Sequence, residues 1–260
     1  MLRTQLNITT ETKLIRQAWE IQLNAEEARE GFYYLPSNSC EVFLVLKGSL
    51  TRELVGTNRK SNLYSGKGYF GLVRPRAMCL RSDEDVTFIL LQIDSSVGFS
   101  FCSKIDEGER KILWPLEELL VDSSDHWCFG NIKALAESLN KHLKAPSSIG
   151  IVDSSLELIK SSRGKIKVKD LNDQLGICKS TLEEKFSQMI GLSPKEVCKI
   201  EKLNFFLSNY NKYSDLSLTE LTFKSGYYDQ SHLIKDFKYF ADLSPRKYLK
   251  QTKRLDSVIV

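Results

Sequence analysis

A twofold internal repeat in the C-terminal part of the chain constrains the fold more than any other feature of the sequence. Residues 171–195 and 221–246 match at an offset of 50 positions that becomes 51 after the glycine, so the second copy holds one extra residue in its turn. Repetition of this kind indicates two copies of one supersecondary unit. The matched pairs are Leu171 and Leu221, Gly176 and Gly226, Leu182 and Leu233, Phe186 and Phe237, Leu192 and Leu243, Ser193 and Ser244, and Pro194 and Pro245.

Each copy has the sequence pattern of a helix-turn-helix. A short first helix is predicted over residues 169–175 in one copy and over 218–224 in the other. It ends at the repeated glycine, because glycine readily adopts the left-handed conformation that stops a helix. The turn that follows has the length that the motif requires. The second helix is expected to begin with a capping box at Ser180-Thr181-Leu182-Glu183 in the first copy, and with Asp229 as N-cap in the second copy.

The apolar spacing of the two second helices fixes which of their side chains point outward. Leu182 with Phe186, and Leu233 with Phe237, are pairs at i, i+4, which lie on one face of a helix and are expected to face the core. The outward positions are therefore Lys179, Ser180, Glu183 and Glu184 in the first copy, and Gln230, Ser231, Ile234 and Lys235 in the second copy.

A connecting helix is predicted between the two copies. Ser193 is a good N-cap, Pro194 suits the first helical position, and Glu196 completes the pattern. A helix over residues 194–209 would be about 24 Å long. Such a rigid spacer can hold two recognition helices about 34 Å apart, one turn of DNA, on one side of the duplex. A closing helix is expected from Ser244, with several basic side chains able to reach phosphates.

The N-terminal part of the chain has strand-like patterns instead. Residues 14–102 contain short apolar runs such as 42–46 and 86–91, separated by turn residues such as those at 36–38 and 65–68. Many short strands of this kind predict a β-sandwich or barrel, which we interpret as cupin-like. The expected fold class is thus α+β with two domains: an N-terminal cupin-like β-barrel or sandwich with flanking helices, and a C-terminal all-α domain with two helix-turn-helix motifs joined by a linker helix.

A helical stripe after Pro115 leads to the expected domain boundary. Its residues are Ile132, Leu135, Ala136, Leu139 and Leu143, and the chain then breaks at Pro146-Ser147-Ser148. The stripe either packs on its own β-domain or forms a dimer helix. We therefore expect a sensor or dimerisation domain over residues 1–146 and the double helix-turn-helix domain over 147–260.

The residue inventory excludes several kinds of site. The three histidines, at positions 126, 142 and 232, all lie outside 14–102, which excludes a histidine-ligated metal site in the barrel. No phosphate-binding or dinucleotide-binding glycine motif and no nucleophile elbow is present, so no cofactor is expected. The six cysteines are widely spaced and are read as reduced, mostly buried thiols. The alternative is that Cys40, Cys79 and Cys102 converge as a redox or metal cluster.

The positive charge of the chain is confined to the segment that contains the repeat. Residues 1–150 carry 18 Lys and Arg against 19 Asp and Glu, a net charge of −1, whereas residues 151–260 carry 19 against 14, a net of +5. A basic C-terminal part suits a polyanionic partner if a nucleic-acid-binding fold occupies it. No apolar run is long enough to span a bilayer and no secretory signal opens the chain, so we expect a cytoplasmic protein with no membrane partner.

The repeat region resembles the DNA-binding domain of AraC-type transcription regulators over about residues 149–250. The resemblance is most specific in Gly226-Tyr227-Tyr228-Asp229-Gln230-Ser231-His232-Leu233, followed by Asp236-Phe237-Lys238 and by Leu243-Ser244-Pro245-Arg246-Lys247-Tyr248-Leu249. The N-terminal part is similar to the β-rich sensor domains that precede this module in one branch of the family. The resemblance implies double-stranded DNA as partner, together with RNA polymerase, a small-molecule effector and a homodimer.

The same resemblance assigns the candidate DNA-binding residues. It maps Lys179, Ser180, Thr181, Glu183 and Glu184 onto the first recognition helix, and Gln230, Ser231, Ile234 and Lys235 onto the second. Gln230 can pair with adenine, Lys235 can donate to guanine or phosphate, and Ile234 can pack on a thymine methyl group. The adjacent glutamates of the first helix depart from the family pattern and repel phosphates, so we favour the second helix as the main source of affinity.

Two classes of function therefore compete. The first is a sequence-specific, effector-responsive regulator of transcription that binds double-stranded DNA and is not an enzyme. The second is a cofactor-free β-barrel enzyme or small-molecule-binding protein with a helical appendage. The paired helix-turn-helix motifs favour the first class, because an appendage does not require two outward faces at a fixed spacing.

Overall fold

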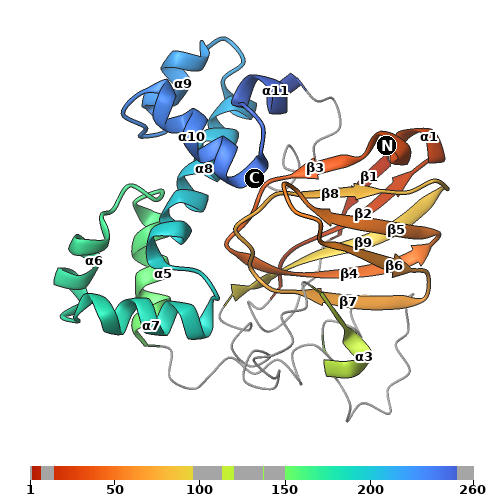
Figure 1. Cartoon of the computed structure of the whole chain (residues 1–260), viewed down its shortest axis with the longest axis horizontal. Coiled ribbons are helices and arrows are strands. Elements are labelled where there is room, and N and C mark those ends of the chain that lie inside the picture. The colour runs from red at the N-terminus through yellow and green to blue at the C-terminus, as the bar shows by residue number, and fades with distance from the viewer. Residues whose placement is uncertain (1, 7–14, 96–112, 120–136, 138–149, 251–260) are drawn as a thin grey trace.

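The N-terminal half of the protein folds into two antiparallel sheets that face each other (Figure 1). The structure is a computed structural model that describes residues 2–6, 15–95, 113–119, 137 and 150–250. One sheet has six strands in the order β1-β2-β9-β4-β7-β10, and the other has four in the order β3-β8-β5-β6. The strands are β1 (Leu2–Gln5), β2 (Ile15–Leu23), β3 (Phe32–Tyr34), β4 (Ser39–Lys47), β5 (Ser49–Leu54), β6 (Lys60–Tyr64), β7 (Lys67–Gly71), β8 (Met78–Arg81), β9 (Val86–Asp94) and β10 (Trp114–Pro115).

The two apolar runs of the sequence form the centre of the six-stranded sheet. β4 and β9 pair with Phe43 opposite Leu90 and Val42 opposite Leu91. Phe43 and Leu90 belong to the buried cluster shared with the four-stranded sheet. Val42 and Leu91, on the opposite face, belong to a cluster that continues into the C-terminal helices. The runs are continuous rather than alternating because both faces of this sheet are buried, so the predicted strands at 42–46 and 86–91 are confirmed.

The C-terminal half is entirely helical over residues 150–250. The short helices α1 (Ala25–Glu30) and α3 (Leu116–Leu119) flank the sheets, and the helical domain begins at α5. Its helices are α5 (Ile151–Ser161), α6 (Val168–Leu175), α7 (Lys179–Met189), α8 (Pro194–Lys212), α9 (Leu218–Lys224), α10 (Gln230–Ala241) and α11 (Pro245–Lys250). In Figure 1, α8 runs between a lower group formed by α5, α6 and α7 and an upper group formed by α9, α10 and α11.

The two helix-turn-helix motifs predicted from the repeat are present as α6–α7 and α9–α10. Gly176 ends α6 in the left-handed conformation at φ +64°, and Gly226 follows α9 with φ +83°. The connecting helix begins as predicted, with Ser193 and Glu196 forming a capping box around Pro194. It extends to Lys212, three residues beyond the expected end, because its last turn is still buried at Asn209, which donates a hydrogen bond to Ser225 at 3.0 Å.

Other predictions are wrong or lie outside the described residues. The expected capping box at Ser180 is wrong: α7 begins at Lys179, and its N-cap is Cys178. The predicted stripe from Ile132 to Leu143 and the position of Cys102 lie outside the described residues, and so does the expected domain boundary near residue 146. Cys40 and Cys79 are both buried and free of disulfides, on strands of different sheets.

Candidate nucleic-acid interface

The outward faces of α7 and α10 hold the nine candidate residues. Leu182 and Phe186, like Leu233 and Phe237, are completely buried, so the predicted core-facing pairs are confirmed. The nine candidate side chains are not part of this core. Lys179, Ser180, Glu183, Glu184, Ser231 and Lys235 are exposed, and Thr181, Gln230 and Ile234 are partly exposed. None of the nine is covered by another part of the described chain, although the N-terminal domain contacts the same helical domain.

The first motif, α6–α7, has a charged outward face whose groups interact with one another. Lys179 lies 3.6 Å from Glu183 one turn later, and Gln188 donates to Glu184 at 3.2 Å. Cys178, the N-cap of α7, is exposed and its sulfur lies within 3.1 Å of the Ser180 hydroxyl and 3.0 Å of the Thr181 hydroxyl. Hydrogen bonds from Ser180 and Thr181 lower the pKa of this thiol to about 7. A lowered pKa increases the thiolate fraction of this exposed cysteine near neutral pH.

The second motif, α9–α10, is held by hydrogen bonds at both helix starts. Ser217 and Glu220 form a capping box at the start of α9. Asp229 caps α10 by accepting a hydrogen bond from the backbone of His232 at 2.7 Å, which confirms the predicted N-cap. Gln230 then reaches back to α9, where its Nε2 donates to the Thr219 hydroxyl at 2.6 Å. The first side chain of α10 thus has a hydrogen-bond partner on α9.

A buried ion pair ties α10 to the connecting helix. The Asp236 carboxylate is 2% exposed and accepts a hydrogen bond from the Lys199 ammonium of α8 at 2.8 Å. A second link joins the same helices, because the Tyr239 hydroxyl donates to Glu196 at 2.8 Å. The repeat did not indicate that Thr219, Lys199 and Asp236 form contacts that hold α10. A charged residue between the core positions Leu233 and Phe237 was the available indication that Asp236 needs a buried partner.

The N-terminal domain contacts the C-terminal end of α10. The backbone N–H of Ala77, in the loop between β7 and β8, donates to the carbonyl of Phe240 at 2.7 Å. This bond satisfies one of the carbonyls that the last turn of a helix leaves without an intrahelical partner. The Arg76 guanidinium lies 5.3 Å from the centre of the Tyr239 ring. The recognition helix of the second motif is therefore held at its end by the other domain.

A second contact joins the N-terminal domain to α8. The Asn38 side chain donates to the Val197 carbonyl at 3.2 Å and to the Glu201 carboxylate at 3.1 Å. Burial raises the pKa of Glu201, while the hydrogen bond from Asn38 opposes that shift. Because α8 carries both motifs, this contact and the one at Ala77 fix the double motif against the sheets.

The interior of the N-terminal domain holds a charged cluster that the sequence did not indicate. Arg74 donates to the Glu41 carboxylate at 2.6 Å, Tyr34 donates to the same oxygen at 3.1 Å, and Arg52 lies 3.8 Å from it. The three charged side chains are at least 93% buried. Two guanidinium groups thus lie close to one buried carboxylate. Arg74 belongs to the same loop as Ala77, so the cluster and the end of α10 are joined by three residues of chain.

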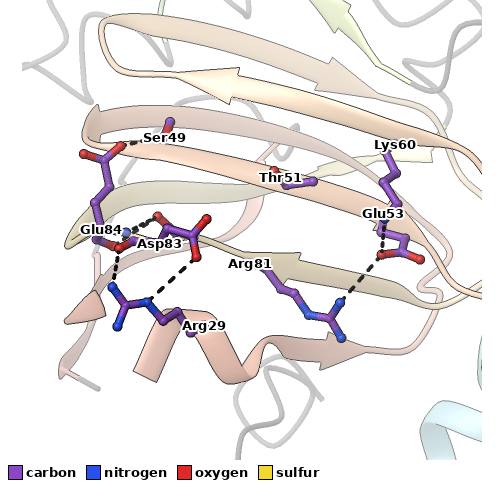
Figure 2. A pocket seen from close by; sticks show the side chains of 9 residues that line it. Arg29, Ser49, Thr51, Glu53, Lys60, Arg81, Asp83 and Glu84 are labelled. Carbon is purple, nitrogen blue, oxygen red and sulfur yellow. Dashed lines mark hydrogen bonds and ion pairs between the residues drawn. The ribbon is translucent and has the colours of Figure 1, made fainter. Parts of the chain in front are cut away.

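A polar pocket lies on the outer face of the four-stranded sheet, the face turned away from the six-stranded sheet (Figure 2). Its volume is about 350 Å³. Figure 2 shows that its charges pair with one another: Arg29 with Asp83 at 3.8 Å, and both Lys60 and Arg81 with Glu53, at 3.4 and 3.9 Å. Glu84 accepts a hydrogen bond from Ser49 at 2.7 Å. Three cations balance three carboxylates, so the pocket has no charge preference for an anionic partner.

Comparisons with known proteins agree with this architecture. Residues 171–251 match the family model described as a helix-turn-helix domain. The structure is similar to that of ToxT from Vibrio cholerae O395, with a TM-score of 0.55 and 15% sequence identity over 92% of this chain and 98% of that chain. It is also similar to ToxT from Vibrio cholerae strain SCE256 with a bound unsaturated fatty acid, with a TM-score of 0.53 and 15% identity over 88% and 93% of the two chains. No curated protein sequence is significantly similar to the chain.

The comparisons confirm two of the predictions made from the sequence. The C-terminal segment contains a helix-turn-helix domain, and the predicted architecture of a β-rich N-terminal domain followed by an all-α domain with two helix-turn-helix motifs is correct. At 15% identity the likeness to ToxT establishes the fold alone. Among the described residues, no helix is both long and apolar enough to cross a membrane.

Proposed function

We propose that the protein is a sequence-specific transcription regulator that binds double-stranded DNA by inserting α7 and α10 into successive major grooves. The observation that carries this proposal is the twin motif itself: two outward faces, α7 and α10, lie at either end of one continuous helix and are left uncovered by the docked N-terminal domain. The 19-residue helix α8 is about 28 Å long, which suits the roughly 34 Å between successive major grooves on one side of the duplex.

The side chains of the second motif support base-specific reading. Gln230 offers the donor and acceptor pattern that adenine requires, and Lys235 can donate to guanine or to a phosphate. In the first motif, Lys179 provides a positive charge, whereas Glu183 and Glu184 disfavour phosphates and can accept only from a base such as cytosine. We therefore assign most of the sequence specificity to α10. RNA polymerase and a second copy of the chain are the further partners that the AraC resemblance implies.

A gel-shift titration of the purified chain tests this function. The DNA target is first selected from a random pool, and binding is then measured at two salt concentrations, because phosphate contacts make affinity fall steeply with salt. Gln230→Ala and Lys235→Ala are each expected to cost about 1–3 kcal/mol of specific binding. Lys179→Ala should weaken binding to all duplexes uniformly. It should also reduce the slope of log affinity against log salt concentration by about one. Unchanged affinity in both α10 variants would contradict the assignment of the second recognition helix.

We further propose that the N-terminal domain senses a small acidic molecule. Two observations support this: the fatty acid bound to the similarly folded ToxT, and the short chain distance from Arg74, which pairs with the buried Glu41, to the α10 contact at Ala77. A ligand that binds only the folded protein raises its melting temperature. A fatty acid should therefore raise Tm and the matching alcohol should not. Equal shifts would contradict recognition of the acid group by the N-terminal domain.

A further inference from the structure

The hydrogen bond between Thr219 and Gln230 connects the two helices of the second motif at their outward surface. Gln230 Nε2 donates to Thr219 Oγ1 at 2.6 Å, so the second residue of α9 holds the first residue of α10. Both ends of this bond lie on fixed backbone, because the capping box at Ser217 holds the start of α9 and Asp229 caps α10. The Gln230 amide is therefore oriented before any DNA arrives.

The engaged amide retains the hydrogen-bonding groups that adenine needs. One Nε2 hydrogen of Gln230 is given to Thr219, which leaves one N–H donor and the Oε1 acceptor. The major-groove edge of adenine offers the N7 acceptor and the N6 donor, which match these two groups. Guanine offers two acceptors, O6 and N7, and would be matched best by two donors. With Thr219 in place, Gln230 has only one.

We infer that Thr219 is a positioning residue that fixes the Gln230 amide so that the second motif selects adenine over guanine. This inference rests on the proposed DNA-binding function. Binding normally requires a flexible glutamine side chain to be ordered, and holding it in the bound conformation beforehand removes that cost. The gain applies only to the base that matches the held amide, so it acts on specificity rather than on general affinity.

The first motif provides an internal comparison for this role. The positions that match Thr219 and Gln230 in the repeat are Lys169 and Lys179. Two ammonium groups are both donors and cannot hydrogen-bond to each other. Lys179 instead lies 3.6 Å from Glu183 on its own helix. The Thr219 contact is therefore a property of the second motif and not of the repeated fold.

The experiment measures base preference in the full chain and in its variants. The base pair read by Gln230 is first identified in the selected DNA site as the pair whose preference Gln230→Ala abolishes. Affinities for duplexes with adenine or guanine at that position are then compared in the wild type, Thr219→Val and Thr219→Ser. Thr51→Val, which removes the hydroxyl of a partly exposed threonine on β5 of the N-terminal domain, is the control.

Thr219→Val should lower the adenine-over-guanine ratio about threefold to tenfold, the usual range for losing one hydrogen bond. Thr219→Ser keeps the hydroxyl and should retain the wild-type ratio, as should Thr51→Val. Affinity for unrelated duplexes and the salt dependence should not change. In a Gln230→Ala background, Thr219→Val should have no further effect on the ratio, because the two residues act through one contact.

Several outcomes would overturn the inference. A ratio unchanged by Thr219→Val, or an equal weakening for every duplex, would make Thr219 a structural residue only. A Gln230→Ala variant that keeps every base preference would show that the amide reads no base. In these cases the proposed function stands if the wild type still selects a DNA sequence. Absence of any sequence-specific duplex binding by the wild type would instead remove the proposed function and this inference together.

Discussion

The two helix-turn-helix motifs arise from one repeated pattern, yet within the described residues only the second helix of the second motif, α10, is hydrogen-bonded to other elements at both its start and its end. α10 is capped by Asp229 at its start, held by Ala77 of the other domain at its end, and linked to α8 through Asp236. α7 ends on a local contact instead, where the Gly191 N–H donates to Phe186 and Ser187. The two motifs therefore share one backbone fold, but the contacts at the ends of α7 and α10 differ.

The outward faces of the motifs differ in the same direction. At matched positions, α10 carries Gln230 and Lys235 where α7 carries Lys179 and Glu184. An amide held in place suits the reading of a base edge, whereas a lysine on an exposed helix acts as a mobile positive charge. If the proposed function holds, the first motif should contribute mainly to orientation on the duplex and the second mainly to sequence specificity.

Removing the buried carboxylate of α10 should produce the largest difference between the motifs. Asp236→Ala removes the carboxylate that pairs with the Lys199 ammonium. Removing one partner of a buried ion pair lowers the free energy of unfolding by about 3–5 kcal/mol, and we expect the lower end of that range here. The lower end applies because Lys199 remains 32% exposed and keeps part of its hydration. Lys185→Ala, at the matched position of α7, should cost less than about 0.5 kcal/mol. Urea unfolding followed by far-UV circular dichroism measures both, and equal losses would mean that the two motifs are held alike.

The N-caps should show a smaller difference in the same sense. Asp229→Ala removes a side-chain cap that accepts a 2.7 Å hydrogen bond, and such losses cost about 1 kcal/mol. Cys178→Ala removes an N-cap residue for which no side-chain capping hydrogen bond is formed, so the loss of unfolding free energy should be smaller than that for Asp229→Ala. The same urea titrations compare the two variants. A loss for Cys178→Ala as large as that for Asp229→Ala would show that the thiol caps α7 after all.

The repeat predicted most of the helical domain because its information is local. Gly176 ends a helix, Ser193 and Glu196 cap one, and Leu182 and Phe186 face the core for reasons contained within a few residues. The error at Ser180 has a local origin too. A serine before Glu183 fits a capping box, but the turn after Gly176 is short enough for the helix to start at Lys179, with a cysteine at the cap position.

The contacts that distinguish the motifs could not be predicted from the sequence, because they join residues far apart in it. Lys199 and Asp236 are separated by 37 positions, and the Ala77 contact with Phe240 crosses between domains. In the sheets, Arg52 occupies an inward position of β5 between Leu50 and Leu54, where the alternation predicts an apolar residue. A buried arginine indicates a partner, but only the fold identifies that partner as Glu41.

The thiol of Cys178 offers a direct way to see whether the first motif also reaches DNA. Its pKa of about 7 means that the thiolate fraction, and with it the rate of alkylation by iodoacetamide, should rise through neutral pH and level off above it. Burial raises the pKa of Cys198 to about 11, so that cysteine should not react in the same range. Mass spectrometry of the digested protein separates the two sites, and Cys178→Ser is the control for assignment.

Bound target DNA should slow the alkylation of Cys178 severalfold, because the thiol lies beside Ser180 and Thr181 at the start of α7, where phosphates and base edges would exclude the reagent. Unrelated duplex at the same concentration should protect less, since it is held only by charge. Full reactivity of Cys178 in a complex that still depends on Gln230 would mean that α10 binds alone. The first motif would then not contact the duplex, and the helix of about 28 Å between the two motifs would not set the spacing of two DNA-bound helices.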